Sequence, residues 1–154
     1  MNSFIKARFD SYQQQLISST AVLRYTVIKL NVTSSDGRVR VRARLIDGGL
    51  LEFAEYIEVD HNDVIITHSY AFHWQDAHNH LCQRWDNVNH FPSLPYAPHH
   101  IHRVDGSVEG NPTIPTGFLK ANPSATNTTW GAHIYVRIIE SRRVGVKGVG
   151  GDEF

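Results

Sequence analysis

The segment VRVRARLIDGGLLEFAEYIEV, residues 39–59, predicts two β-strands and the turn that joins them. From Val39 to Ile46, apolar residues alternate strictly with other residues, mostly arginines, which is typical of a strand with one buried face. The Asp-Gly-Gly sequence at 47–49 favours a tight turn, and residues 50–59 predict the partner strand. The segment is therefore expected to form an antiparallel hairpin with one apolar face.

A helix and three further strands are predicted around this hairpin. The helix, from about Ser3 to Ser18, is indicated by an apolar stripe at Ile5, Phe9, Tyr12 and Leu16. The other strands are expected at Val22 to Thr33, Val64 to Trp74 and Leu81 to Val88. The predicted fold class is α+β: a single domain with an antiparallel meander sheet of about five strands and the N-terminal helix packed on one face.

This domain is expected to occupy residues 1–118, and residues 119–154 form a C-terminal extension. In the extension, Ile134, Val136 and Ile138 alternate as in one added strand, and the remainder is expected to be a flexible tail.

The composition is that of a globular domain without a strong overall charge. Fifteen Lys and Arg residues balance fifteen Asp and Glu residues, so no net field attracts nucleic acid or membrane. The N-terminus lacks the apolar run of a secretory signal, and no segment approaches the roughly 18 apolar residues of a membrane span. The lone Cys82 excludes an internal disulfide and a cysteine-based zinc site. A cytoplasmic domain without a membrane segment is expected.

Four of the fifteen bases nevertheless lie within seven residues, on one face of one predicted strand. These residues, called the arginine strip below, are Arg38, Arg40, Arg42 and Arg44. Guanidinium groups bind phosphates bidentately, so the strip is a candidate substrate-binding surface. The alternative is a solvated face that discourages edge pairing or pairs with acids on neighbouring strands.

The register of the following strands decides which polar residues face the core. A two-residue turn after Asp60 would place Glu55 opposite His68, both on a core-facing surface. A carboxylate buried there must be paired or protonated.

The next connection, at residues 77–79, leaves two registers open. A three-residue loop would add Arg84 and Asp86 to the core-facing surface, whereas a two-residue loop would add Gln83 and Trp85.

The segment RWDNVNHFPSLPYAPHHIH, residues 84–102, is expected to be a strand end followed by a long polar loop. If its last residues are extended, His100 and His102 point the same way. With Asp86 they can hold a transition metal or zinc and leave a position open for water. Without metal, the imidazoles can exchange protons in acid–base catalysis. A surface histidine cluster is the third interpretation.

The order of these motifs resembles the TumE-like family of bacterial and archaeal toxin–antitoxin proteins. The resemblance covers about Tyr12 to His102. It implies a small toxin with a cognate antitoxin, often one that carries a helix-turn-helix. The matching positions are Asp47, Glu55, Tyr70, Arg84, Asp86, Asn87, His90, His100 and His102. The chain departs from the family pattern at Trp85, where tyrosine is usual, and after Gly117.

The leading hypothesis is a toxin that cleaves RNA as a metal-independent endoribonuclease. One of His100 and His102 would take the proton of a ribose 2′-OH, and the other, or His90, would protonate the leaving oxygen. Arg84 would stabilise the phosphorane, and Asp86 or Glu55 would orient an imidazole. Asn87 completes the expected catalytic set, and the arginine strip with Tyr70 is expected to bind substrate.

Two alternatives remain open. The first is a metal-dependent phosphoesterase or nucleotide-modifying enzyme that binds zinc or manganese through His100, His102 and Asp86, whereas the leading hypothesis needs no cofactor. The second is a non-catalytic protein that binds its partner through the arginine strip. A homo-oligomer is compatible with all three.

Overall fold

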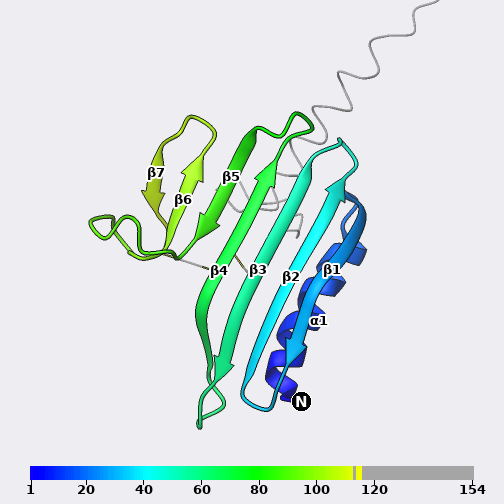
Figure 1. The fold of residues 1–154 in the computed structure, drawn as a ribbon, viewed down its shortest axis with the longest axis vertical. Coiled ribbons are helices and arrows are strands. Elements are labelled where there is room, and N and C mark those ends of the chain that lie inside the picture. The colour runs from blue at the N-terminus through cyan, green and yellow to red at the C-terminus, as the bar shows by residue number, and fades with distance from the viewer. Residues whose placement is uncertain (113, 116–154) are drawn as a thin grey trace, which may run out of the picture.

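The computed structural model describes residues 1–112 and 114–115. One helix lies against an antiparallel sheet whose seven strands follow one another in chain order (Figure 1). The elements are α1 (Ser3–Ser18), β1 (Val22–Val32), β2 (Asp36–Leu45), β3 (Leu50–Val59), β4 (Ile65–Gln75), β5 (Leu81–Asp86), β6 (His100–Arg103) and β7 (Val108–Gly110).

The predicted α+β class, the meander and the N-terminal helix are confirmed, but the sheet has seven strands in place of about five. The two strands not predicted are β6 and β7, which lie in and after the proline-rich segment. The predicted extension at 119–154, with its added strand, lies outside the described residues.

The helix is fixed at its start and along its apolar stripe. Asn2 caps it, since its side chain accepts hydrogen bonds from the N–H groups of Phe4 and Ile5. Gly37 on β2 lets the helix approach the sheet closely, because a Cβ there would lie only 2.4 Å from Ile5 Cγ2. The predicted stripe is buried: Ile5, Phe9, Tyr12 and Leu16 are 6% exposed or less.

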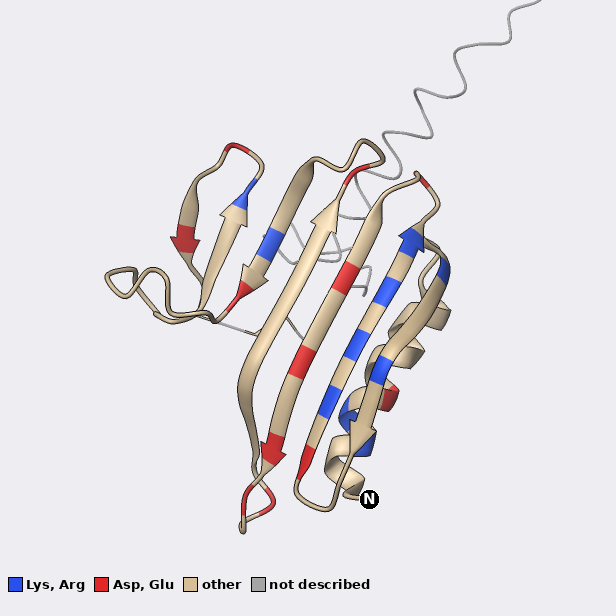
Figure 2. Ribbon diagram, in the orientation of Figure 1, with Lys and Arg blue, Asp and Glu red and all other residues tan. Residues whose placement is uncertain are grey.

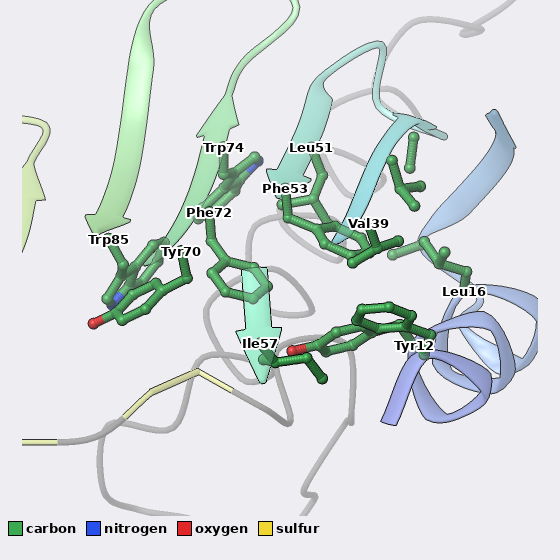
Figure 3. Close-up of a cluster of buried hydrophobic side chains, with 14 of the residues drawn as sticks. Tyr12, Leu16, Val39, Leu51, Phe53, Ile57, Tyr70, Phe72, Trp74 and Trp85 are labelled. Carbon is green, nitrogen blue, oxygen red and sulfur yellow. The ribbon is translucent and has the colours of Figure 1, made fainter. Parts of the chain in front are cut away.

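The core lies between α1 and one face of the sheet, called the helix face below (Figure 3). Tyr12 packs against Phe53, with ring centroids 5.1 Å apart, and Phe53 stacks on Phe72 at 5.4 Å. Side chains alternate along β2 and β3, so their apolar residues enter this core while the arginine strip points away from it. The other face, which carries the strip together with Glu52, His73 and Arg84, is called the open face.

The predicted pairing of Glu55 with His68 is wrong. Three residues, 61–63, form the β3–β4 loop. Farther from this loop, the pairing of β3 with β4 shifts at a bulge between Tyr56 and Ile57. Glu55 therefore lies opposite Tyr70, and His68 is 41% exposed beside Glu58. The expectation assumed a two-residue turn and continuous pairing.

The same bulge changes which aliphatic residues face the core, both in β4 and at the position just before it. Val64 and Ile66, which strict alternation with the buried Tyr70 would turn toward the core, are 53% and 42% exposed. Ile65 packs against the core in their place.

A second bulge decides the face of β5. The β4–β5 loop has three residues, 77–79, yet pairing shifts between Trp74 and Gln75. Trp85 consequently lies opposite Phe72 and is buried on the helix face. The residues on either side of Trp85 take the opposite orientation, which places Arg84 and Asp86 away from the helix.

Candidate metal centre on the open face of the sheet

The register of β2 to β6 aligns polar residues in two rows across the sheet. In the first row the consecutive partners are Arg42, Glu52, His73, Arg84 and His102. In the second they are Arg40, Ala54, Ala71, Asp86 and His100. The arginine strip and the histidine motif, distant in the sequence, therefore share one side of the sheet.

Asp86, His100 and His102 form a compact cluster of side-chain donors at one end of these rows. His100 Nε2 lies 3.1 Å from Asp86 Oδ1 and 3.1 Å from His102 Nε2. His102 Nε2 lies 3.8 Å from Asp86 Oδ2. Ligands of a tetrahedral zinc ion, each about 2.1 Å from the metal, are about 3.4 Å apart. The cluster therefore has the size of three positions of such a coordination shell.

A hydrogen bond on the side of the His100 ring that points away from the cluster fixes the orientation of the ring. Its Nδ1 lies 2.8 Å from the carbonyl oxygen of Pro98, and since a carbonyl only accepts, Nδ1 carries the proton. In the neutral ring, Nε2 then presents a lone pair toward Asp86 Oδ1 and His102 Nε2. A proton on His102 Nε2 can bridge the two imidazoles, and a metal ion between the three groups would be bound by all of them.

Neighbouring groups hold the other donors. Asp86 Oδ2 accepts a hydrogen bond from Arg84 Nε at 2.8 Å, and Oδ1 accepts one from the N–H of Val88 at 3.1 Å. The ring of Phe91, from the loop before β6, stands edge-on against both imidazoles at 5.1 and 5.8 Å. The loop thus covers the cluster on one side and keeps its rings in place.

Access to the cluster is from the His102 side. The side chains of His100 and Asp86 are each 2% exposed, whereas His102 is 27% exposed. The pKa of His102 is lowered by burial and by the charges of His100, Arg84 and His90, which together outweigh the attraction of Asp86. The reachable imidazole is therefore held toward its neutral form.

Beside the cluster, the open face is hollowed into a shallow pocket of about 520 Å³. The alanines Ala54 and Ala71 form part of its floor, and Arg40 and Arg84 contribute to its walls. Short side chains in the second row thus leave room between the basic strand β2 and the Asp–His–His cluster. Figure 2 shows the order of the charges across the sheet, with basic residues along β2, acidic residues along β3 and a further basic position on β5.

The arginine strip is partly neutralised. Arg40 and Arg42 both donate to the carboxylate of Glu52, with Nε–O distances of 2.8 and 2.7 Å. Arg38 lies over the ring of Tyr56, 4.2 Å from its centroid. The predicted alternative of acids on a neighbouring strand is thus realised for two of the four arginines.

Two basic residues of the open face were not predicted. Arg24 on β1 lies opposite Arg44, and Lys29 lies opposite Arg40. Residues five positions apart in a regular strand lie on opposite faces. A shift in register between Val27 and Lys29 brings Arg24 and Lys29 to the same face. Only the pairing could have revealed them.

The other predicted site residues lie elsewhere. Glu55 is on the helix face, where Arg8 Nη2 and the hydroxyl of Tyr12 donate to it at 2.7 and 2.8 Å. Tyr70 is also buried there, stacked on His99. Since the sheet separates them from the cluster, neither touches the candidate site.

Asn87 and His90 lie next to the cluster in sequence but not within it. Asn87 continues the pairing of β4: it accepts from the N–H of Tyr70 at 2.9 Å and donates to the carbonyl of His68 at 3.0 Å. His90 is exposed, in the loop that carries Phe91. The structure thus joins Arg84, Asp86, His100 and His102, and places His90 near them.

The short distance between the two imidazoles limits their chemistry. In acid–base cleavage, each catalytic nitrogen needs its own oxygen about 2.8 Å away, on opposite sides of phosphorus. His100 Nε2 and His102 Nε2, in contrast, converge on one place and are separated by 3.1 Å. This geometry favours metal binding over acid–base catalysis shared by the two imidazoles, because their nitrogens converge as metal ligands do.

The fold and the site define an α+β protein with a basic open face beside an Asp–His–His cluster. The family model described as Toxin TumE matches residues 12–123, and because this is more than half of the chain, the protein belongs to the TumE toxin family. It is thus a toxin of a toxin–antitoxin system, with an antitoxin as its partner. No curated protein and no solved structure matches the chain significantly. No helix among the described residues could span a membrane.

Proposed function

We propose that this toxin cleaves RNA by means of a divalent metal ion, such as zinc or manganese, held by Asp86, His100 and His102. The observation that carries the proposal is the orientation of His100. Its Nδ1–H is bound to the carbonyl of Pro98, so Nε2 converges with a carboxylate oxygen and a second imidazole within 3.1 Å. A hydrogen bond that fixes the outer nitrogen of an imidazole is the usual support of a histidine metal ligand.

When bound, such an ion polarises a phosphoryl oxygen and makes its bound water more acidic. Arg84 is placed to bind the phosphate beside it. Its Nε is engaged by Asp86 and its side chain is 42% exposed, so the end of its guanidinium group remains available to a phosphate. Arg84 therefore both positions Asp86 and offers charge to the reacting group.

The open face provides the binding surface for the rest of the strand. Arg24, Arg44 and Lys29 form no ion pair with any acid in the part of the chain that the structure describes. These free cations and the pocket lined by Arg40 and Arg84 favour a polymer of phosphates over a single small phosphate ester.

A metal-free mechanism is the second candidate. It is favoured by His90, which is close enough to lower the pKa of His102 and whose imidazole can serve as the second proton carrier. In this mechanism His100 and Asp86 would orient His102.

The test is cleavage of RNA, and of DNA of the same sequence, by the purified full chain with and without EDTA. Loss of RNA cleavage in EDTA, its return with zinc or manganese, and its absence in His100→Ala/His102→Ala would support the proposal. His80→Ala is the matched control, since that side chain is exposed in the β4–β5 connection.

Two other results would lead elsewhere. Cleavage that persists in EDTA and is lost in His90→Ala would establish the metal-free mechanism. If the wild-type chain binds RNA or a protein without cutting anything, the enzymatic proposal fails. Loss of that binding on charge reversal at Arg40 and Arg42 would then favour the non-catalytic alternative.

A further inference from the structure

The outer edge of the sheet next to α1 is long and apolar. β1 has eleven residues and pairs only with β2 among the described strands. Several large apolar side chains on it are open to solvent: Leu23 is 67% exposed, Val27 45%, Ile28 47% and Leu30 59%. Within residues 1–112 and 114–115, its outer backbone groups have no strand partner, and soluble proteins usually protect such an edge with charge, proline or a covering segment.

The two sides of this edge differ in chemistry. On the helix face, Tyr25, Val27 and Leu30 line a shallow apolar groove together with Phe9 and Leu16 of α1. On the open face, the strand presents Arg24 and Lys29, whose partners on β2 are also basic. No acid occurs in Val22–Val32.

We infer that β1 is the docking edge for an extended segment of the antitoxin. That segment adds to the sheet as one more antiparallel or parallel strand, through backbone hydrogen bonds. Its alternate side chains are apolar on the helix face, where they cover Leu30 and the groove. On the open face they are acidic and pair with Arg24 and Lys29.

A second copy of this chain fits the edge poorly. Pairing β1 with another β1 would bring Arg24 and Lys29 next to the same two bases of the other copy, with no acid on either strand. Like charges facing each other across strands are destabilising. The charge of the edge therefore selects an acidic strand and disfavours self-association.

The docking also gives a way in which the antitoxin can inhibit the toxin, and this inference rests on the proposed function. Acids placed beside Arg24 and Lys29 offset the basic surface that RNA would use. The antitoxin strand would then weaken RNA binding without reaching the Asp–His–His cluster.

The first test uses synthetic peptides and the purified full chain. A peptide of about ten residues with alternating valine and glutamate should bind, as measured by fluorescence anisotropy. Replacing glutamate by lysine, or valine by serine, should weaken binding at least about tenfold. Equal binding of the lysine peptide, or no binding of the glutamate peptide, would overturn the inference.

The second test uses Leu30→Asp, with Val104→Asp as the matched control because Val104 is 67% exposed in the β6–β7 turn. Neither residue belongs to the candidate site. Both variants should fold, as judged by circular dichroism, and should arrest growth like the wild type. Only Leu30→Asp should escape neutralisation by the antitoxin and lose peptide binding.

Normal neutralisation of Leu30→Asp would contradict the inference, and so would a wild-type dimer that this substitution dissolves. Failure of the RNA proposal would be visible separately, as absent cleavage with intact peptide binding and neutralisation.

Discussion

Arg24 lies directly opposite Arg44 in the β1–β2 register, and neither forms an ion pair with an acid in the described part of the chain. Two like charges in this position lower the stability of a sheet. The pair is understandable if its role is to attract an anion, because the repulsion in the free protein is relieved when a phosphate binds between the guanidinium groups.

The first prediction follows from this pair. Arg24→Ala or Arg44→Ala should raise the free energy of unfolding by about 0.2–1 kcal/mol. Each should also weaken RNA binding and reduce the slope of log affinity against log salt by about 1. Urea unfolding and titrations at several salt concentrations measure the two effects. Lys6→Ala, on the exposed side of α1, is the control and should leave RNA affinity unchanged. Unchanged affinity in both arginine variants would remove them from the binding surface.

The second prediction concerns metal binding, apart from any activity. The purified chain should take up about one divalent ion, and zinc or manganese at 100 times its Kd should stabilise the fold by about 2.7 kcal/mol. Metal analysis and thermal unfolding after dialysis against EDTA measure this. Asp86→Asn or His102→Ala should lose most of the stabilisation, and His80→Ala should keep it. Stabilisation retained in both cluster variants would place the ion elsewhere.

The third prediction is an acid-dependent loss of stability centred on Glu52. Burial alone would raise the pKa of Glu52, but the hydrogen bonds from Arg40 and Arg42 outweigh it and hold the pKa below its ordinary value of 4.5. A lowered pKa means that the contribution is fully present above the ordinary value and is lost as the pH falls through the folded-state pKa.

Glu52→Gln should therefore be less stable than the wild type at about pH 7, and the difference should be smaller at about pH 3. Denaturant unfolding at both values measures the difference. A difference that stays constant with pH would mean that the ion pairs of Glu52 do not stabilise the fold.

The fourth prediction separates structure from chemistry at Glu55. Its side chain is fully buried beside Arg8, which is 20% exposed, and removing one partner of a buried ion pair costs about 3–5 kcal/mol. Glu55→Ala should destabilise the fold by this amount yet leave metal uptake unchanged. The double variant Arg8→Met/Glu55→Leu should recover part of the loss. If the folded Glu55→Ala protein instead takes up less metal, Glu55 contributes to metal binding at the Asp–His–His cluster.

The sequence pattern predicted the elements of the first 86 residues well. The limits of α1 match at Ser3 and Ser18, and the strand at 50–59 matches β3. Periodicity is reliable here because each element buries one continuous apolar face. It also predicted that His100 and His102 point the same way if extended, and β6 places them so.

Pairing between strands was not predictable in the same way. The bulge between β3 and β4 and the one between β4 and β5 each insert one residue, and a shift of one residue exchanges the faces of everything beyond it. For this reason His68 is exposed although it was expected in the core, and Trp85, rather than Arg84, is buried there. Glu55 lies on the helix face and Arg24 lies on the open face for the same reason. Both positions depend on how the strands pair, which no local sequence pattern encodes.

The Asp–His–His cluster takes one donor residue from β5 and two from β6, and residues 87–99 separate the two strands. During translation, a chain that has emerged only as far as the end of β5 already contains the helix, five strands and the whole arginine strip. It still lacks two of its three donors. Under the proposed mechanism, a nascent toxin would therefore be unable to cleave RNA until β6 has emerged, although most of its sheet is already made.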